Sequence, residues 1–451
     1  MTDQRQADSI GRPFSDRVVV LFLTQVVTAG VGILNGFVLA RLLGPSAKGD
    51  YYLLTLLPTT IMVAIQLGLP QGFGFHAARD ETTGLTRKTL VLTAALATPA
   101  FAVTVALLPV LESSFLGHLD HGLIVFALLA LPIALNATFT TGIVLGRQAV
   151  RWYAAVSIGQ VLAYTVLMIV IVGVLGTGLV GALVVYLIVL GLQAGGFLLG
   201  SARATAGATT QAAVGIRDLF RYGLRIYPAT ITQFFSYRVD VFLLAALLAH
   251  PSAPLGYYSM GVSMAEMVFF FPNAVSILFF PHVAGSDRED ADRQVPTVSR
   301  VTLLLTAAVA IALAPIATAL ISVLLPAFTP ALPALYILLP GVVTLSVTKV
   351  LTGYLNGLGR TGLTSGVSIA SFVLNAALNL ILIPSYGILG AATASLVSYT
   401  ASSMLFTVIA GRLARVGWLD FWIPRWSDVR FTADTITTLG RRLWQSRGAG
   451  S

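Results

Sequence analysis

Five ionisable side chains lie within long apolar stretches of the sequence. They are Arg41, Arg238, Asp240, Glu266 and Lys349. A charge at the centre of a lipid bilayer costs about 2.5–3.5 kcal/mol even on the milder insertion scales, so each of these groups should face a cavity or a partner. The basic groups are suited to a phosphate ligand, because a guanidinium fork pairs with phosphate oxygens. The carboxyl groups are suited to ion coupling, since a carboxyl at low dielectric can take up a proton near neutral pH.

The spacing of these residues limits their roles. Arg238 and Asp240 are two positions apart, about 200° around a helix, so they cannot share a face. Two roles are open for each carboxylate, Asp240 and Glu266: coupling to a proton or sodium ion, or an ion pair that only fixes packing. Arg238 and Lys349 are the candidate partners in such a pair. For Arg41, near the end of its apolar stretch, the alternative to phosphate binding is snorkelling to the outer surface.

Uncharged polar residues in the same stretches extend the candidate binding surface. Lys349, Thr352 and Asn356 fall at i, i+3 and i+7 and share one helix face. Further cavity candidates are Gln25, Asn35, Asn136 and Asn273. Each amide has an alternative role in hydrogen bonding between membrane helices.

No pattern typical of an enzyme site occurs. The sequence lacks a glycine-rich phosphate loop, an HExxH motif and a nucleophile elbow. It has no cysteine, which excludes disulfides, thiolate metal sites and cysteine nucleophiles. We therefore expect no catalytic residue, no metal and no cofactor. The net charge of +9 is explained by arginines in loops beside apolar stretches, so no nucleic-acid partner is expected.

The elements that must position these residues are membrane-spanning helices. Hydrophobic residues make up 56% of the 451 and charged residues only 10%, against about 25% charged in soluble proteins. Mean hydropathy is +0.87. Since a helix needs about 20 apolar residues to cross a bilayer, the sequence predicts an all-α polytopic membrane protein with about twelve spans. Their predicted limits are 17–43, 49–70, 88–111, 121–145, 150–174, 178–200, 220–249, 255–280, 299–325, 331–357, 362–383 and 387–411.

The chain repeats itself. A turn rich in glycine, proline and tyrosine, 39–52, has a weaker copy at 250–258, and Thr89–Ala95 matches Thr302–Ala308. Six spans in each half is an even number, so both halves enter the membrane in the same orientation. The repeats are therefore predicted to be parallel.

Lysine and arginine are concentrated in alternate loops, with Arg41 and Lys48 as exceptions. The positive-inside rule therefore places both termini and the mid-chain linker in the cytoplasm. The predicted divisions are an N-terminal tail 1–16, an N lobe with spans one to six 17–200, a cytoplasmic linker 201–219, a C lobe with spans seven to twelve 220–411, and a C-terminal tail 412–451.

The C-terminal tail is basic and rich in tryptophan. Trp418, Trp422, Trp426 and Trp444 lie among arginines. Tryptophan at headgroup level with arginine reaching anionic lipid is typical of a segment on a membrane surface. We expect the first part of the tail to lie there; a solvated basic tail is the alternative.

Short motifs throughout the apolar region resemble one known family. In the first half they are Ala40-Arg41, Gly44-Pro45, Gly49-Asp50-Tyr51-Tyr52 and Gln66-Leu67-Gly68-Leu69. In the second half they are Tyr222-Gly223, Pro228, Arg238-Val239-Asp240, Gly256-Tyr257-Tyr258 and Asn356-Gly357-Leu358-Gly359-Arg360. Together, over 17–411, they resemble bacterial polysaccharide and oligosaccharide flippases of the multidrug/oligosaccharidyl-lipid/polysaccharide exporter superfamily.

The resemblance implies two six-helix lobes, N and C, around a central cationic cavity. It also implies flipping of an undecaprenyl-pyrophosphate-linked oligosaccharide to the outer leaflet of the bacterial cytoplasmic membrane by alternating access, coupled to a proton or sodium ion. The expected partners are this lipid, membrane lipids, a polysaccharide polymerase and glycosyltransferases.

The expected site residues fall into two groups. Three residues of this sequence match charged positions of the family's pattern: Arg41, Arg238 and Asp240. The expected headgroup-binding residues are Arg41, Arg238, Lys349, Gln25, Asn35, Asn273 and Asn356, and the expected coupling residues are Asp240 and Glu266.

Two other classes of protein are weighed against a flippase. A small-molecule antiporter is the first alternative, either from the drug-exporting branch of the same superfamily or a major-facilitator carrier, which also has twelve spans in parallel repeats. The loop at 70–88 lacks the acidic, arginine-rich signature of the latter. A membrane polysaccharide polymerase or ligase is the second, but the predicted outer loops are too short for its catalytic loop.

Overall fold

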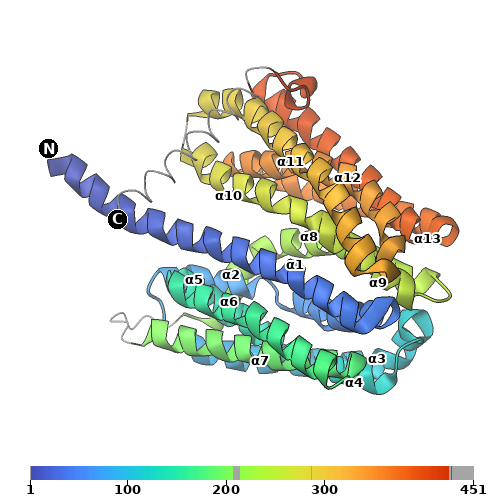
Figure 1. Ribbon diagram of the computed structural model, residues 1–451. Helices are drawn as coiled ribbons and strands as arrows, with labels where there is room; N and C mark the ends of the chain where they lie inside the picture. Colours follow the sequence, from blue (N-terminus) through green and yellow to red (C-terminus); the bar gives the residue numbers. More distant parts are fainter. Residues whose placement is uncertain (1, 207–213, 286, 426–427, 429–451) are drawn as a thin grey trace, which may run out of the picture. The chain divides into compact units, whose positions relative to one another are not determined.

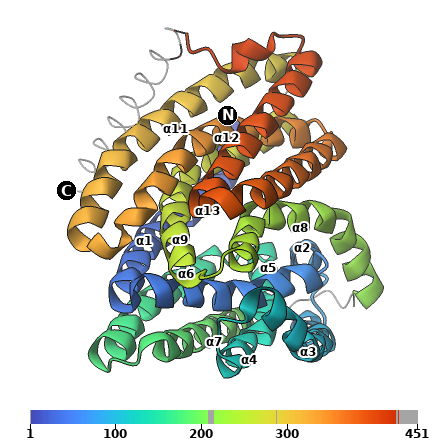
Figure 2. The same ribbon diagram turned by 90° about the vertical axis from the view of Figure 1, so that its right-hand side faces the viewer.

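The computed structural model describes residues 2–206, 214–285, 287–425 and Asp428 (Figures 1 and 2). All regular structure in these residues is helical. Long apolar stretches fold this way because each backbone polar group is then satisfied within its own segment, without water. The predicted all-α class is confirmed.

The helices of the first part of the chain are α1 (Thr2–Ile65), α2 (Leu69–Ala78), α3 (Leu85–Leu111), α4 (His121–Leu128), α5 (Ala130–Gly146), α6 (Val150–Leu167) and α7 (Gly178–Thr205). Two π-helical turns, Glu112–Leu116 and Met168–Val174, extend α3 and α6. The later helices are α8 (Ile216–Leu247), α9 (Ser252–Glu266), α10 (Phe270–Gly285), α11 (Arg288–Leu324), α12 (Leu332–Gly357) and α13 (Thr361–Ala414). Short 3₁₀ turns are Met267–Phe269, Pro326–Ala331 and Trp418–Phe421.

Each of the twelve predicted spans falls on a helix or on a pair of successive helices. Within the described residues, eight helical stretches are long and apolar enough to cross a membrane. Two of them, in α1 and α13, contain a non-helical glycine, Gly44 (φ 71°) and Gly387 (φ 55°), and so comprise two spans each. The more polar α8 and the α9–α10 pair occupy the positions predicted for spans seven and eight.

Contacts divide the chain into two compact units. Unit 1 is Met1–Met260 with Leu324–Phe328, and unit 2 is Gly261–Val323 with Thr329–Ser451. Helix α8 therefore makes its contacts within unit 1. The predicted boundary between an N lobe and a C lobe at 201–219 stays a prediction.

In unit 1, α7 lies along α5 and α6, α1 lies along α6, and α2 packs on α5 (Figure 1). The α2–α5 contact is between backbones. A Cβ atom on Gly142 would collide with the Pro70 carbonyl oxygen, and one on Gly146 with the Gly74 carbonyl oxygen. Two glycines four positions apart are a common device for close approach of membrane helices.

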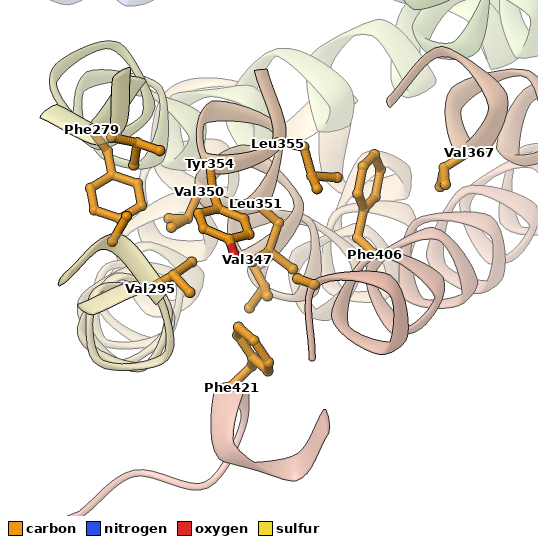
Figure 3. Close-up of a cluster of buried hydrophobic side chains, with 13 residues drawn as sticks. Phe279, Val295, Val347, Val350, Leu351, Tyr354, Leu355, Val367, Phe406 and Phe421 are labelled. Carbon is orange, nitrogen blue, oxygen red and sulfur yellow. The ribbon is translucent and has the colours of Figure 1, made fainter. Parts of the chain in front are cut away.

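In unit 2, α12 packs against both α10 and α13. Its buried side chains meet those of α10, α11 and α13 in one apolar cluster (Figure 3). The cluster also includes Phe421, which lies beyond the last membrane helix and is fully buried. The first part of the C-terminal tail is therefore folded onto unit 2.

Arg300 of α11 fastens this tail segment. Its Nε donates to Asp428 Oδ2 over 2.6 Å, Nη2 donates to Asp428 Oδ1 over 3.1 Å, and Nη1 donates to the Asp420 carbonyl oxygen over 2.6 Å. The Arg300 and Asp428 side chains are only 4% and 2% exposed. Trp422 Nε1 adds a hydrogen bond of 3.3 Å to Thr407 Oγ1.

Other side chains of the tail point outward. Trp418 is 48% exposed and Ile423 is 56% exposed. Apolar side chains of this kind suit the headgroup level of a membrane, so the interfacial position stays a prediction that the exposed residues favour. Trp426 and Trp444 lie outside the described residues.

Candidate functional site

The two turns that the sequence relates as copies are in contact within unit 1. A Cβ atom on Gly256 would overlap the Pro45 carbonyl oxygen, and one on Gly49 would overlap the Ser252 carbonyl oxygen. The turn inside α1 and the start of α9 thus touch backbone to backbone. Glycine is required at 49 and 256 because no other side chain fits this approach.

This contact positions two tyrosines against α8. Arg238 Nη1 donates to Tyr52 Oη over 3.0 Å, while Tyr258 Oη donates to Asp240 Oδ2. Asp240 is 5% exposed, and its Oδ1 also accepts from the Val241 backbone N–H over 2.9 Å. Arg238 and Asp240 thus bond to different helices, one to α1 and the other to α9, in agreement with the prediction that they do not share a face.

Lys48 lies beside this network and is 6% exposed. Its Nζ donates to Ser259 Oγ over 2.6 Å and lies 5.8 Å from the centre of the Phe328 ring. No carboxylate lies within ion-pair distance of Lys48 among the described residues. Burial of an ammonium group without a carboxylate partner costs free energy of folding. Sequence reasoning noted Lys48 only as an exception to the positive-inside rule; its position two residues before Asp50 gave no sign of burial.

Arg41 is exposed, and its Nη1 donates to the Leu324 carbonyl oxygen over 2.8 Å. This carbonyl belongs to the last residue of α11, where carbonyl groups lack partners within the helix. Because the acceptor is neutral, this hydrogen bond does not offset the guanidinium charge. Arg41, Arg238 and Asp240, which were predicted as site residues, all lie in unit 1. Lys48, which was not predicted, lies in the same unit.

The amides predicted for unit 1 have different surroundings. Asn35 donates to the Val161 carbonyl oxygen over 3.1 Å and accepts from Thr165 Oγ1 over 2.5 Å, so it joins α1 to α6. Asn136 lies 3.5 and 3.4 Å from the hydroxyls of Thr89 and Thr93 on α3. Gln25 is exposed.

The remaining predicted residues lie in unit 2. Lys349 Nζ is 5.6 Å from the centre of the Phe269 ring, and Asn356 Oδ1 accepts from Thr364 Oγ1 over 3.1 Å. Glu266 and Asn273 are half-buried. Substrate binding and ion coupling by all these residues stay predictions.

A second polar feature of unit 1 is a cavity of about 580 Å³ between α1, α2, α5 and α7. Its polar lining residues are Thr59, Gln71, Thr138, Thr141, Tyr186 and Gln193. Sequence reasoning missed all six. Gln193 carried the available signal, because it is the one amide in the otherwise apolar stretch 178–200.

Comparisons with known proteins agree with this architecture. The family model described as polysaccharide biosynthesis protein matches residues 38–327, which include the opening turn, its copy and α8. The chain is 23% identical over 416 residues to the probable low-salt glycan biosynthesis flippase Agl15 of Haloferax volcanii, covering 89% of this chain and 85% of that protein. It is 25% identical over 189 residues to the uncharacterised membrane protein MJ1068 of Methanocaldococcus jannaschii, covering 41% and 37%.

Solved structures share the fold at low sequence identity. The lipid II flippase MurJ in its inward closed conformation gives a TM-score of 0.65 at 13% identity, covering 89% of each chain. An inward-facing multidrug resistance MATE family transporter of the MOP superfamily gives 0.63 at 14% identity, covering 86% of this chain and 94% of that one. The chain therefore belongs to the polysaccharide biosynthesis protein family, and its fold is that of the multidrug/oligosaccharidyl-lipid/polysaccharide exporter superfamily.

Proposed function

We propose that this protein flips a polyprenyl-diphosphate-linked oligosaccharide from the cytoplasmic to the outer leaflet of the cytoplasmic membrane by alternating access, for the synthesis of surface polysaccharide. The family match over residues 38–327 carries the proposal. The similarity to a probable glycan biosynthesis flippase over 89% of the chain supports it.

The headgroup of such a lipid carries a diphosphate, and basic residues are its natural partners. Arg41 and Arg238 are proposed to bind it in unit 1, and Lys349 in unit 2. The first two already make hydrogen bonds to neutral oxygens, of Leu324 and Tyr52. Phosphate oxygens can replace these acceptors with stronger, charge-assisted hydrogen bonds.

Ion coupling is assigned to the two carboxylates. Asp240 is buried and accepts a hydrogen bond from Tyr258, so a change in its protonation alters a contact between α8 and α9. Glu266 is half-buried at the end of α9. A proton or sodium ion bound at either carboxylate would favour one conformation of the transporter over another.

The experiment is lipid extraction from cells depleted of the protein, followed by mass spectrometry. We expect a polyprenyl-linked oligosaccharide to accumulate and the surface polymer to disappear. Wild-type gene should restore the polymer, whereas Arg238→Ala and Asp240→Ala should not, although both proteins reach the membrane. Normal polymer from either variant would remove that residue from the mechanism.

A second candidate is a small-molecule antiporter, favoured by the similarity in fold to multidrug resistance transporters. It predicts an unchanged lipid pool and greater sensitivity to cationic drugs after depletion. We propose that the protein is a transporter and not an enzyme. Both of its termini are proposed to be cytoplasmic. Glycosyltransferases would act on the lipid before this protein flips it, and a polymerase would act on it afterwards.

A further inference from the structure

The cavity between α1, α2, α5 and α7 has a lining without any acidic, basic or histidine side chain. Its volume of about 580 Å³ is within the range of small-molecule sites, about 300–1,000 Å³. A site without charge has no attraction for a diphosphate or for a cationic drug. Its ligand should therefore be polar but uncharged.

The amides of the lining offer both donors and acceptors. Gln193 lies in the middle of α7, which is long and apolar enough to cross a membrane, and it has no hydrogen-bond partner in the described part of the chain. A carboxamide at this depth is costly without a partner. Gln71 at the start of α2 is exposed and likewise unpartnered within the described residues. Both are available to water or to a ligand.

The threonines of the lining offer acceptors. Thr59, Thr138 and Thr141 each donate the hydroxyl proton to a carbonyl oxygen of the preceding helical turn, over 2.7–2.8 Å. Each oxygen keeps a lone pair that can accept a hydrogen bond, and the Thr59 hydroxyl is also hydrogen-bonded to Tyr186. Since a sugar hydroxyl both donates and accepts, this combination of threonine acceptors and amide donors matches a sugar edge. Tyr186 and Met62 supply apolar surface for its C–H groups.

The cavity extends along α5 from Ala134 to the last residue of the helix, Gly146. Gly142 and Gly146, which let α2 approach α5, line it, and the next residue, Arg147, forms an ion pair with Asp80. By the positive-inside rule this end is cytoplasmic. That is the side from which, on the proposed function, the lipid-linked oligosaccharide enters.

We propose that this cavity of unit 1 binds an uncharged sugar unit of the transported glycan. The inference rests on the proposed function and assigns the sugar to a site separate from the basic residues. Gln193 and Gln71 donate to sugar hydroxyls, and the three threonines accept from them. Because the contacts to the sugar avoid charge, the ligand can leave without breaking a strong ion pair.

The chain has no cysteine, so a single introduced thiol reports on the cavity. Thr141→Cys, or Gln193→Cys if the first variant is poorly folded, is labelled with N-ethylmaleimide in the purified full-length protein. The probes are millimolar glucose, galactose, mannose and N-acetylglucosamine, with inorganic pyrophosphate and tetraphenylphosphonium as charged comparisons. Ser113→Cys, at an exposed position in the π-helical turn Glu112–Leu116, is the control thiol.

We expect at least one sugar to slow labelling of the cavity thiol threefold or more, with no effect at the control thiol and none from the charged probes. In cells, Gln193→Leu and Thr59→Val should lower polymer yield at least fivefold. Thr60→Val should not, because the Thr60 hydroxyl makes the same 2.8 Å bond within α1 but does not line the cavity.

Protection by a charged probe alone, or no protection with normal polymer yield, would overturn the inference. If no probe protects the thiol and polymer yield is normal, the proposed function would still stand as long as depletion of the protein caused lipid-linked oligosaccharide to accumulate. Absence of that accumulation would instead overturn the proposed function itself.

Discussion

Removal of one charge should release the C-terminal tail. In Asp428→Asn the shape of the side chain is kept, but the carboxylate that accepts two hydrogen bonds from Arg300 is lost. Both side chains are at most 4% exposed, so the change leaves a buried guanidinium without its counter-charge. Breaking a buried pair in this way costs about 3–5 kcal/mol.

That cost sets the size of the effect. Each 1.4 kcal/mol is a factor of ten, so about 3 kcal/mol should raise the detached population of the tail roughly 100-fold. Trypsin cleavage after Arg425 reports this population, because the Arg425 backbone N–H is bonded to Asp428 Oδ2 when the tail is docked. Cleavage by a protease tracks the open fraction when reclosing is fast. We expect cleavage at Arg425, followed by mass spectrometry, to be about 100-fold faster in the variant.

The control is Glu289→Gln, which removes an acidic group from a well-exposed pair with Arg293. Exposed ion pairs contribute little to stability, so the cleavage rate of the Glu289→Gln variant should equal that of the wild type. Equal rates for Asp428→Asn and the wild type would show that the Arg300–Asp428 pair does not hold the tail.

The same pair predicts a dependence on pH. Hydrogen bonds from Arg300 lower the pKa of the Asp428 carboxyl below its usual value. A lowered pKa in the folded state contributes stability that is present above the unfolded pKa, about 3.9, and is lost as pH falls through the folded pKa. Protection of the amides over 417–425, measured as hydrogen exchange relative to the intrinsic rate at each pH, should therefore stay constant at neutral and mildly acidic pH and fall only below about pH 4. A loss of protection between pH 7 and pH 5 would contradict this assignment.

Three further substitutions test the turn contact of unit 1. Gly256→Val should prevent the approach to Pro45 and lower the melting temperature in detergent by several degrees, and an unchanged value would refute the backbone contact. Tyr258→Phe removes the hydroxyl that donates to Asp240 and should cost about 1.5–3 kcal/mol in chemical unfolding; a loss below 0.5 kcal/mol would show that the bond is dispensable. Lys48→Met removes a buried ammonium, so the melting temperature should stay the same or rise; a lower melting temperature would show that the ammonium stabilises the fold.

Much of the fold could be predicted from sequence because membrane helices are encoded locally. Apolar length predicted the spans, and the glycine-proline turn at 44–45 predicted the break that appears in α1 at Gly44. The spacing of Arg238 and Asp240 predicted that they cannot share a helix face, and their bonds to Tyr52 of α1 and Tyr258 of α9 agree with this.

The candidate sites were less predictable because their parts are far apart in the chain. Threonine is common in apolar helices, so nothing local distinguishes Thr59, which lines the cavity, from Thr60, which does not. The cavity forms only where α2 and α5 meet through glycines. Asn35 had two predicted roles, cavity lining and hydrogen bonding between helices, and its bonds to Val161 and Thr165 join α1 to α6.

The most direct test of transport measures which leaflet holds the lipid-linked oligosaccharide. Intact cells are treated with periodate, which does not cross the membrane, and the oxidised fraction of the lipid-linked sugar is measured by mass spectrometry. In cells depleted of the protein, or carrying only Arg238→Ala, we expect the lipid to accumulate and to stay protected from periodate, whereas it is oxidised in wild-type cells. An equal oxidised fraction in depleted and wild-type cells would mean that the lipid reaches the outer leaflet without this protein, and would contradict its role as the flippase.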